Sequence, residues 1–189
     1  GIIVRNTPKA SSIAVAELTF ALMLSAPNHI ITYHNGMKNG EWLKNIKRTE
    51  LYGKTLGLLG IGNIATKVAE RAKAFGMNVV AYDKYVSSSA VATLVPTVED
   101  AVKDADYISI HMPLTDETRN MFNADLFAKM NRKPVIINAA RGAIVNADDM
   151  VKALDDGQVT CYCADVYPSD PPAPDYPLLK SDKVILTPH

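Results

Sequence analysis

A glycine-rich turn, Gly60-x-Gly62-x-x-Ala65, constrains the fold of this chain more than any other segment. The apolar run 55–59 leads into it, and an amphipathic segment follows it at once. This order predicts a strand, a tight turn and a helix, because Gly60 permits the turn and the small Ala65 allows the helix to pack closely on the strand. Gly62 leaves the backbone open, so a pyrophosphate can approach the free N–H groups at the start of the helix.

An acidic residue follows the second expected strand. Asp83 comes directly after the apolar run 78–82. In dinucleotide-binding units, a carboxylate at this place accepts hydrogen bonds from the adenosine ribose hydroxyls. The turn and Asp83 together predict NAD as the cofactor, because a carboxylate would repel the 2′-phosphate of NADP. The neighbouring Lys84 either softens this discrimination or is simply exposed to solvent.

Short apolar runs of strand length recur after residue 53 and alternate with helical segments. The expected strands are 55–60, 78–82, 106–110, 134–138, 159–164 and 184–186, and the expected helices are 63–75, 97–103, 123–130 and 146–156. Such alternation predicts an α/β fold with a doubly wound, six-stranded parallel sheet of the Rossmann type, covered by helices on both faces. Asn123 and Asn146 are candidate N-caps of the last two helices.

The first 53 residues follow a different pattern. Residues 12–35 are apolar at helical spacing and on all sides, which predicts a buried helix that Pro27 kinks or ends. Residues 36–53 are polar, with a basic stretch at 44–48, and indicate an irregular connection whose basic side chains are solvated. We therefore expect one NAD-binding domain over residues 1–189, with an N-terminal helix region at about 1–53 and a Rossmann core at about 54–189.

Composition excludes several classes of protein. The 20 basic and 20 acidic residues cancel, so no positive field attracts nucleic acid or an anionic membrane. No apolar run approaches the roughly 20 residues of a membrane span, and the first residues lack the layout of a signal peptide. We expect a cytoplasmic protein with a small-molecule partner. Cys161 and Cys163 are expected to diverge in a strand without forming a disulfide, and their spacing does not match a zinc site, so no metal is expected.

Polar residues follow several expected strands at their carboxyl ends. His111 follows the third strand, Arg141 the fourth and Asp165 the fifth. Ligands of open parallel sheets bind beyond these ends, so we expect the three residues on one rim. A guanidinium there can hold a carboxylate through two parallel hydrogen bonds.

Ordered sequence blocks extend along the whole chain. They are Asn6-Thr7-Pro8, Ala14-Val15-Ala16-Glu17-Leu18, Gly40-Glu41-Trp42, the glycine turn, His111-x-Pro113, Asn138-Ala139-Ala140-Arg141-Gly142, Asp165-Val166 and Thr187-Pro188-His189. They resemble the cofactor domain of the D-isomer-specific 2-hydroxyacid dehydrogenases, and most of all its phosphoglycerate dehydrogenase branch.

The resemblance implies a catalytic trio. The family's substrate-binding arginine falls on Arg141, its acidic residue on Asp170 and its acid–base histidine on His189. His189 would exchange the hydroxyl proton, and a carboxylate beside it would orient the imidazole and stabilise its protonated form. Arg141 would polarise the 2-oxo group and anchor the substrate carboxylate.

Asp170 departs from the family pattern, which usually has glutamate there. Either the proline-rich loop 167–177 brings the shorter side chain closer to His189, or a water intervenes, or activity is partly lost; we favour the first. The alternative for Asp170 is an exposed loop acid without a role.

The resemblance also implies further cofactor contacts. They involve Asn63 and Ile64 at the turn, Met112, Pro113 and Thr118 after the third strand, Ala139, Ala140 and Arg141 after the fourth, Asp165 at the nicotinamide amide, and His189. For Met112 and Pro113, simple loop packing is the alternative.

The expected function is NAD-dependent hydride transfer to and from a D-2-hydroxy acid. The resemblance favours the pair 3-phosphoglycerate and 3-phosphohydroxypyruvate, in serine biosynthesis, over glycerate or lactate types. Formate dehydrogenases are disfavoured because that branch has an amide where Asp170 stands. A different hypothesis is an NAD-sensing binding module that resembles the C-terminal-binding-protein corepressors.

Two expectations concern parts beyond the cofactor domain. The chain starts without Met and stops at Thr187-Pro188-His189, directly after the run 184–186, which suggests that the substrate domain is absent and that the isolated domain binds NAD(H) but turns over little. The segment 12–35 resembles the one through which family members dimerise, so we expect a homodimer; burial within its own domain is the alternative.

Overall fold

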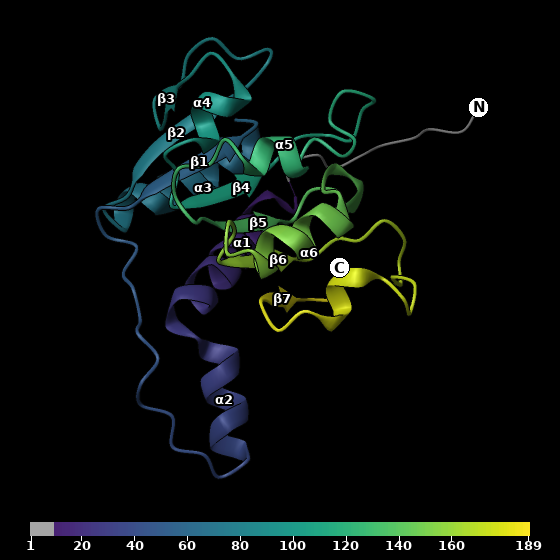
Figure 1. The fold of residues 1–189 in the computed structure, drawn as a ribbon. Coiled ribbons are helices and arrows are strands. Elements are labelled where there is room, and N and C mark those ends of the chain that lie inside the picture. The colour runs from purple at the N-terminus through teal and green to yellow at the C-terminus, as the bar shows by residue number, and fades with distance from the viewer. Residues whose placement is uncertain (1–9) are drawn as a thin grey trace, which may run out of the picture.

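The structure is a computed structural model, and it describes residues 10–189 (Figure 1). At its centre is a seven-stranded parallel sheet in the order β3-β2-β1-β4-β5-β6-β7. The strands are β1 (Thr55–Leu59), β2 (Asn78–Tyr82), β3 (Thr93–Leu94), β4 (Tyr107–Ile110), β5 (Val135–Asn138), β6 (Cys161–Ala164) and β7 (Val184–Leu186). The order runs outward from β1 in both directions, which confirms the predicted doubly wound α/β sheet.

The helices, apart from the second, cover both faces of this sheet. They are α1 (Ser12–Asn28), α2 (Ile30–Lys38), α3 (Asn63–Ala74), α4 (Val98–Val102), α5 (Ala124–Phe127) and α6 (Ala147–Asp155), with 3-10 turns η1 (Gly142–Ile144) and η2 (Pro177–Lys180). One core cluster joins α1 and α3 to the sheet through residues such as Leu56 and Leu58. The other joins α4, α5 and α6 to the opposite face, where Ile108 and Ile136 are fully buried.

The predicted N-caps are confirmed. The Asn123 side chain accepts a hydrogen bond from the Leu126 N–H at 3.2 Å, and that of Asn146 accepts one from the Asp149 N–H at 3.0 Å. Each therefore satisfies one N–H that has no partner within its helix.

Two elements differ from the sequence expectation. Strand β3 was not predicted, because two residues paired with β2 are too short to produce a periodic pattern. The predicted helix 12–35 is two helices, since His29 adopts a left-handed conformation with φ 53° and α2 then continues to Lys38. Pro27 lies in the last turn of α1, as the prediction that it kinks or ends the helix requires.

Helix α2 and the irregular segment 39–54 form an arm that projects from the body of the molecule (Figure 1). The Tyr33 hydroxyl donates to the Ile46 carbonyl at 3.0 Å, which ties the helix to the returning chain. The Arg48 guanidinium lies over the Tyr33 ring, 4.6 Å from its centroid. The basic side chains of the stretch 44–48 are exposed, as predicted.

The expectation that Cys161 and Cys163 diverge is wrong. Side chains two residues apart in a strand share a face, and the two sulfurs lie 3.9 Å apart. Both thiols are free, so the prediction that they do not form a disulfide is confirmed. Cys163 is buried in the core cluster of α1 and α3, and Cys161 is partly buried against it.

Within residues 10–189, no single helix is long and apolar enough to cross a membrane. The pair α1 and α2 would pass by length and composition together, but it is bent by 65° at its break. Helix α1 packs against α3 and the sheet, where Phe20, Leu22 and Met23 are buried.

Candidate active site

The two glycines of the turn between β1 and α3 have different roles. Gly60 has φ +90°, and a Cβ there would lie 2.6 Å from the His111 carbonyl oxygen. Gly62 has φ −76°, and a Cβ there would meet no atom within 4 Å. No side chain caps the start of α3, and Ala65 is fully buried against the core. Gly60 is therefore needed for the turn itself, whereas Gly62 leaves room above the backbone for a pyrophosphate.

A cleft of about 370 Å³ opens beside this turn, between the chain after β2 and the loop after β4. It brings together five residues that the sequence predicts as cofactor ligands, namely Gly60, Asp83, Met112, Pro113 and Thr118. Its size and position at the carboxyl ends of β1, β2 and β4 fit the adenosine half of a dinucleotide.

Asp83 joins the end of β2 to the glycine turn. One of its carboxylate oxygens, Oδ2, accepts from the Ile61 N–H at 2.9 Å, and Oδ1 accepts from the N–H groups of Tyr85 and Val86 at 2.8 and 3.1 Å. Burial raises the pKa of Asp83, but these three hydrogen bonds outweigh it, and the net pKa lies below its ordinary value. A carboxylate can accept about four hydrogen bonds, so Oδ2 keeps capacity for a ribose hydroxyl.

Thr118 is buried in the loop after β4, and its hydroxyl is already engaged. It donates to the Pro113 carbonyl at 2.7 Å and accepts from the Thr115 N–H at 2.8 Å. Thr118 therefore shapes the cleft by closing the loop 113–118, and Met112 and Pro113 line the wall that this loop forms.

His111 forms the wall of the cleft under Gly60. Its Nε2 lies 2.8 Å from the Ser109 hydroxyl, and burial lowers the pKa of His111 to about 4. The imidazole is therefore neutral at pH 7 and adds no charge to the cleft. The sequence predicted His111 on this rim but not its loss of charge, because the burial of a residue after a strand has no sequence signal of its own.

The buried side chain of Asn138 organises the turn after β5. Its Oδ1 accepts from the Ala140 N–H at 3.0 Å, and its Nδ2 donates to the Arg141 carbonyl at 3.0 Å and to the Tyr162 hydroxyl at 3.2 Å. This positions Ala139, Ala140 and Arg141 without using the Arg141 side chain, which is exposed. Sequence reasoning did not single out Asn138, although a polar residue that ends a buried strand could have indicated it.

Gly142 completes the same turn, because a Cβ there would lie 2.1 Å from the Tyr167 carbonyl carbon. The turn that carries Arg141 is thus packed directly on the backbone that follows β6. The Arg141 guanidinium donates to the Ala140 carbonyl at 2.6 Å and is otherwise open to solvent.

Asp165 connects the end of β6 with the C-terminal residues. Its N–H donates to the Asn138 carbonyl at 3.0 Å, and its Oδ1 accepts from the Thr187 hydroxyl at 2.5 Å. The Tyr167 hydroxyl donates to the Thr187 carbonyl at 2.7 Å. These bonds hold the residues before His189 against the end of β6.

His189 and Asp170 are in direct contact. The His189 Nδ1 hydrogen-bonds the Asp170 Oδ2, and both side chains are half exposed. The contact needs no bridging water, so the shorter aspartate reaches the histidine from the proline-rich loop, as the favoured expectation states. The Nδ1 contact leaves Nε2 as the nitrogen that can face a substrate.

The predicted residues thus form two groups on one rim, because all strands are parallel and end at the same edge of the sheet. None of Arg141, Asp165, Asp170 and His189 lines the 370 Å³ cleft. Asn63 and Ile64 are the first residues of α3, directly after the glycine turn; they do not line the cleft, and Asn63 is exposed. The block Asn6-Thr7-Pro8 lies outside the described residues.

Residues 20–189 match the family model described as "D-isomer specific 2-hydroxyacid dehydrogenase, NAD binding domain". The chain belongs to this family. The domain type agrees with the predicted cofactor, NAD, and with the residues of the cleft that fit it. Within residues 10–189, no three His, Cys, Asp or Glu side chains form a group that could hold a metal.

Two curated relatives and one solved structure are closely similar to this 2-hydroxyacid dehydrogenase domain. The D-3-phosphoglycerate dehydrogenase of Methanocaldococcus jannaschii is 45% identical over 100% of the chain and 37% of its own length. The hydroxypyruvate reductase of Thermotoga maritima is 40% identical, over 100% of the chain and 63% of its own. The crystal structure of a glyoxylate reductase from Paecilomyes thermophila gives a TM-score of 0.91 at 33% identity, over 100% of this chain and 58% of that one.

Proposed function

We propose that the protein is an NAD-dependent oxidoreductase that transfers a hydride between NAD(H) and a D-2-hydroxy acid or its 2-oxo acid. The observation that carries this proposal is the contact between His189 and Asp170, on the same rim of the sheet as the glycine turn. Both side chains are half exposed, so the pair is open to a ligand. It suits a group that gains and loses a proton.

The cofactor would lie along the carboxyl ends of the strands. The N–H groups at the start of α3 would hold its pyrophosphate, the free capacity of Asp83 Oδ2 would bind a ribose hydroxyl, and Asp165 would bind the nicotinamide amide. The nicotinamide supplies the donor or acceptor of the hydride.

The chain's own residues would handle the proton and the charge. Oxidation of a 2-hydroxy acid removes a hydride from C2 and a proton from the hydroxyl group, and His189 Nε2 would accept that proton. The Asp170 carboxylate would hold the imidazole in a fixed orientation and tautomer. The exposed Arg141 guanidinium would bind the substrate carboxylate and polarise the C2 oxygen.

We propose 3-phosphoglycerate and 3-phosphohydroxypyruvate as the substrate pair, in serine biosynthesis, in a cytoplasmic protein. The 45% identity to a D-3-phosphoglycerate dehydrogenase supports this choice, while the 40% identity to a hydroxypyruvate reductase keeps a glycerate-type substrate as the second candidate.

A substrate panel tests the proposal. Full-length protein is assayed with NAD and 3-phosphoglycerate, D-glycerate or D-lactate, and the His189→Gln variant serves as the control. We expect 3-phosphoglycerate to have the highest kcat/KM and the variant to lose about 100-fold or more of it. NAD binding without oxidation of any 2-hydroxy acid would instead favour an NAD-sensing binding module that resembles the corepressors.

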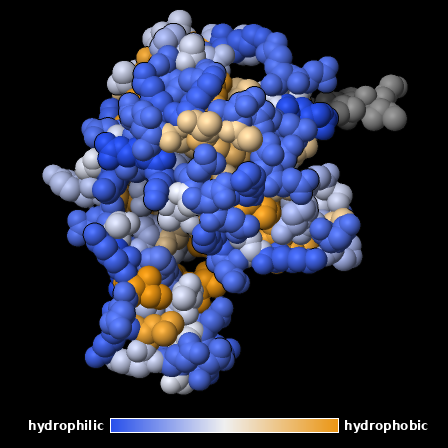
Figure 2. Space-filling model, in the orientation of Figure 1, coloured by the Kyte–Doolittle hydropathy of each residue, from blue (hydrophilic) through white to orange (hydrophobic). Residues whose placement is uncertain are grey.

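We further propose that the protein is a homodimer, with the arm as its contact surface. Most large apolar side chains of α1 pack in its own domain, with Ile13 exposed, and the arm exposes several more, among them Ile30, Ile31, Met37, Trp42 and Leu43. Figure 2 shows apolar residues gathered on the arm. A second copy of this chain would remove this surface from water.

A further inference from the structure

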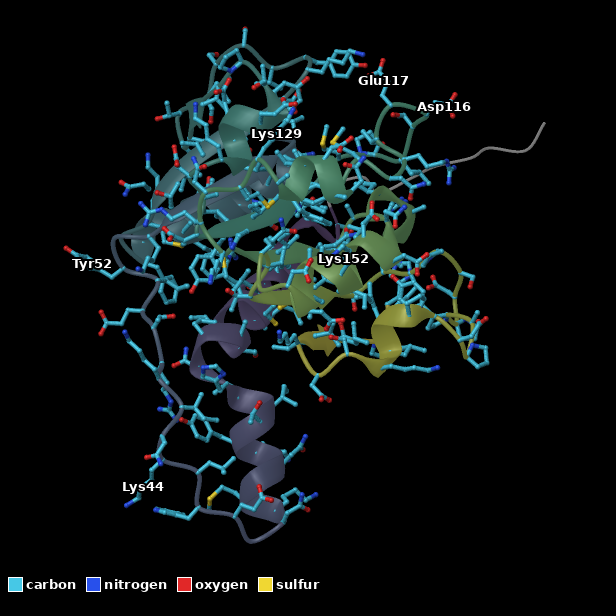
Figure 3. All side chains as sticks on the ribbon, in the orientation of Figure 1. Lys44, Tyr52, Asp116, Glu117, Lys129 and Lys152 are labelled. Atoms are coloured by element: carbon cyan, nitrogen blue, oxygen red, sulfur yellow. The ribbon has the colours of Figure 1, made fainter. Side chains whose placement is uncertain are left out.

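An ion pair crosses the mouth of the cofactor cleft. The Lys84 ammonium lies 2.9 and 2.7 Å from the two carboxylate oxygens of Glu117. Lys84 follows β2 directly after Asp83, and Glu117 belongs to the loop after β4, so the pair joins the two lips of the cleft. Figure 3 shows Glu117 and Asp116 on that projecting loop, well away from Lys129.

Lys84 is the one cationic side chain among the residues that line this cleft in the part of the chain the structure describes. The imidazole of His111 in the same cleft is neutral at pH 7. Three carboxylates, Asp83, Asp116 and Glu117, also line it. The 2′-phosphate that NADP carries on its adenosine ribose would therefore meet a cleft of net negative charge. Among the described residues, the one cation that lines this cleft, Lys84, is already paired with Glu117.

The ion pair acts on the ammonium directly. The hydrogen bond to Glu117, and then its charge, raise the pKa of Lys84 above its ordinary value, so Lys84 stays charged but engaged. The side chains are exposed to solvent, so the carboxylate offsets the field of the ammonium by a modest amount rather than completely.

We propose that Glu117 is a cofactor-specificity residue: it holds Lys84 and partly offsets its charge, and thereby keeps the cleft selective for NAD(H) over NADP(H). This inference rests on the proposed use of the cleft for a dinucleotide. Asp83 alone repels a 2′-phosphate, but an adjacent free ammonium would attract one, and Glu117 weakens that attraction. Specificity in this cleft is then set by two loops rather than by the β2 end alone.

Titration of the chain with NADH and with NADPH tests the inference, by calorimetry at low ionic strength. In Glu117→Gln, we expect NADPH to bind roughly threefold to tenfold tighter while NADH affinity changes less than about twofold. In Lys84→Met, an unpaired Glu117 remains beside Asp83, so NADPH should bind several-fold weaker. Both effects should shrink at about 0.5 M salt, since exposed charges are screened.

Glu99→Gln is the matched control, because Glu99 forms an ion pair of the same kind with Lys129 at 2.9 Å and neither residue lines the cleft. This variant should leave both affinities unchanged. An unchanged NADPH-to-NADH ratio in Glu117→Gln, or an equal change in Glu99→Gln, would overturn the inference. If the wild type binds neither nucleotide, the proposed function itself fails; if it binds NADH and only the ratio stays fixed, the specificity role alone fails.

Discussion

At the scale of single residues, the site depends on side chains that hold one another. Asp170 bonds to His189, Asp165 to Thr187, and Asn138 to the backbone of Arg141. In each pair, one member would contact a ligand and the other positions it. Of the three positioning residues, only Asp170 was predicted from the sequence as a site residue, whereas the ligand-contacting members of the pairs were all predicted.

Removing the charge of Asp170 tests its action on His189. In the full-length protein, Asp170→Asn should lower kcat/KM by about tenfold or more and change the pH–rate profile, because the imidazole loses the carboxylate at its Nδ1. Asp170→Glu, which restores the usual family residue, is the control and should keep both. A pH–rate profile of Asp170→Asn that matches the wild type would rule out this role.

His111 predicts a dependence of stability on pH. Since burial lowers its pKa to about 4, the unfolded chain binds a proton below about pH 6.5 that the folded chain does not. Stability from this residue is therefore complete above pH 6.5 and is lost as the pH falls to 4, by up to roughly 3 kcal/mol.

Urea unfolding of the wild type and His111→Gln between pH 7 and pH 4 measures this term. Other groups titrate in both proteins, so the difference between the two curves isolates residue 111. We expect the variant to lose less stability than the wild type over this range. Parallel curves would show that His111 is protonated as readily in the folded protein as in the unfolded one.

At the scale of elements, the unit β1–turn–α3 was predictable because the geometry of the turn dictates which residue types can stand in it. Gly60 is required by its positive φ and Ala65 by close packing, whereas Gly62 leaves space for a ligand, and the spacing of the three residues is visible in the sequence. Pro27 predicted that the first helix kinks or ends, but the left-handed conformation of His29, where α1 ends, was not predictable in the same way. A left-handed histidine depends on how the arm leaves the body, and the apolar pattern of residues 12–35 continues across it.

Two features near the sheet were not predicted correctly from the sequence, namely the Lys84–Glu117 ion pair and the arrangement of the two cysteines. The contact of Asp170 with His189 could be expected from the family pattern, but the pair Lys84–Glu117 joins residues 33 positions apart in exposed loops that have no periodic pattern. The strand that contains the two cysteines was predicted correctly, but residues two positions apart in a strand lie on the same face, so the expected divergence of their side chains was wrong.

Replacing each glycine of the turn by alanine separates folding from binding. Gly60→Ala should destabilise the protein by about 2 kcal/mol or more, because φ is positive and the Cβ would clash with the His111 carbonyl. Gly62→Ala should leave the melting temperature nearly unchanged, since nothing lies near its Cβ, yet it should weaken NADH binding by about tenfold or more.

Thermal unfolding and NADH titration of both variants give the comparison. Gly157→Ala is a control for the backbone effect alone, because Gly157 also has positive φ but nothing lies near its Cβ. Equal NADH affinity in Gly62→Ala and the wild type would mean that no pyrophosphate approaches the turn at this glycine.

At the scale of the whole molecule, the parallel sheet brings both groups of predicted site residues to one edge, and the arm projects away from the sheet. Residues of this chain form the walls of the cleft by β2 and β4, whereas Arg141 and His189 are exposed to solvent beyond β5 and β7. The curated relatives are longer than the matched segment, which spans 37% and 63% of two of them. We therefore expect these 189 residues, expressed alone, to bind NADH but to oxidise 2-hydroxy acids hardly at all.

The arm gives the last prediction, about assembly. Ile30 and Met37 lie seven residues apart on α2, hence on one face, and are 50% and 54% exposed, while Trp42 on the returning segment is 71% exposed. When a second copy covers these exposed apolar side chains, the burial stabilises the dimer by about 25 cal/mol for each Å² of apolar surface removed from water. The double variant Ile30→Glu/Met37→Glu would bring like charges together in such an interface and should therefore be a monomer.

Sedimentation velocity at about 20 µM, a concentration above the dissociation constant of a dimer of micromolar affinity, distinguishes the two states. We expect the wild type to sediment as a dimer and the double variant at half that mass, with unchanged helix content. Ile13→Glu is the control, since Ile13 is 51% exposed on α1, outside the arm, and should remain dimeric. A wild-type monomer, or a double variant that is still a dimer, would exclude the arm as the contact surface, and in the second case the interface must lie elsewhere on the molecule.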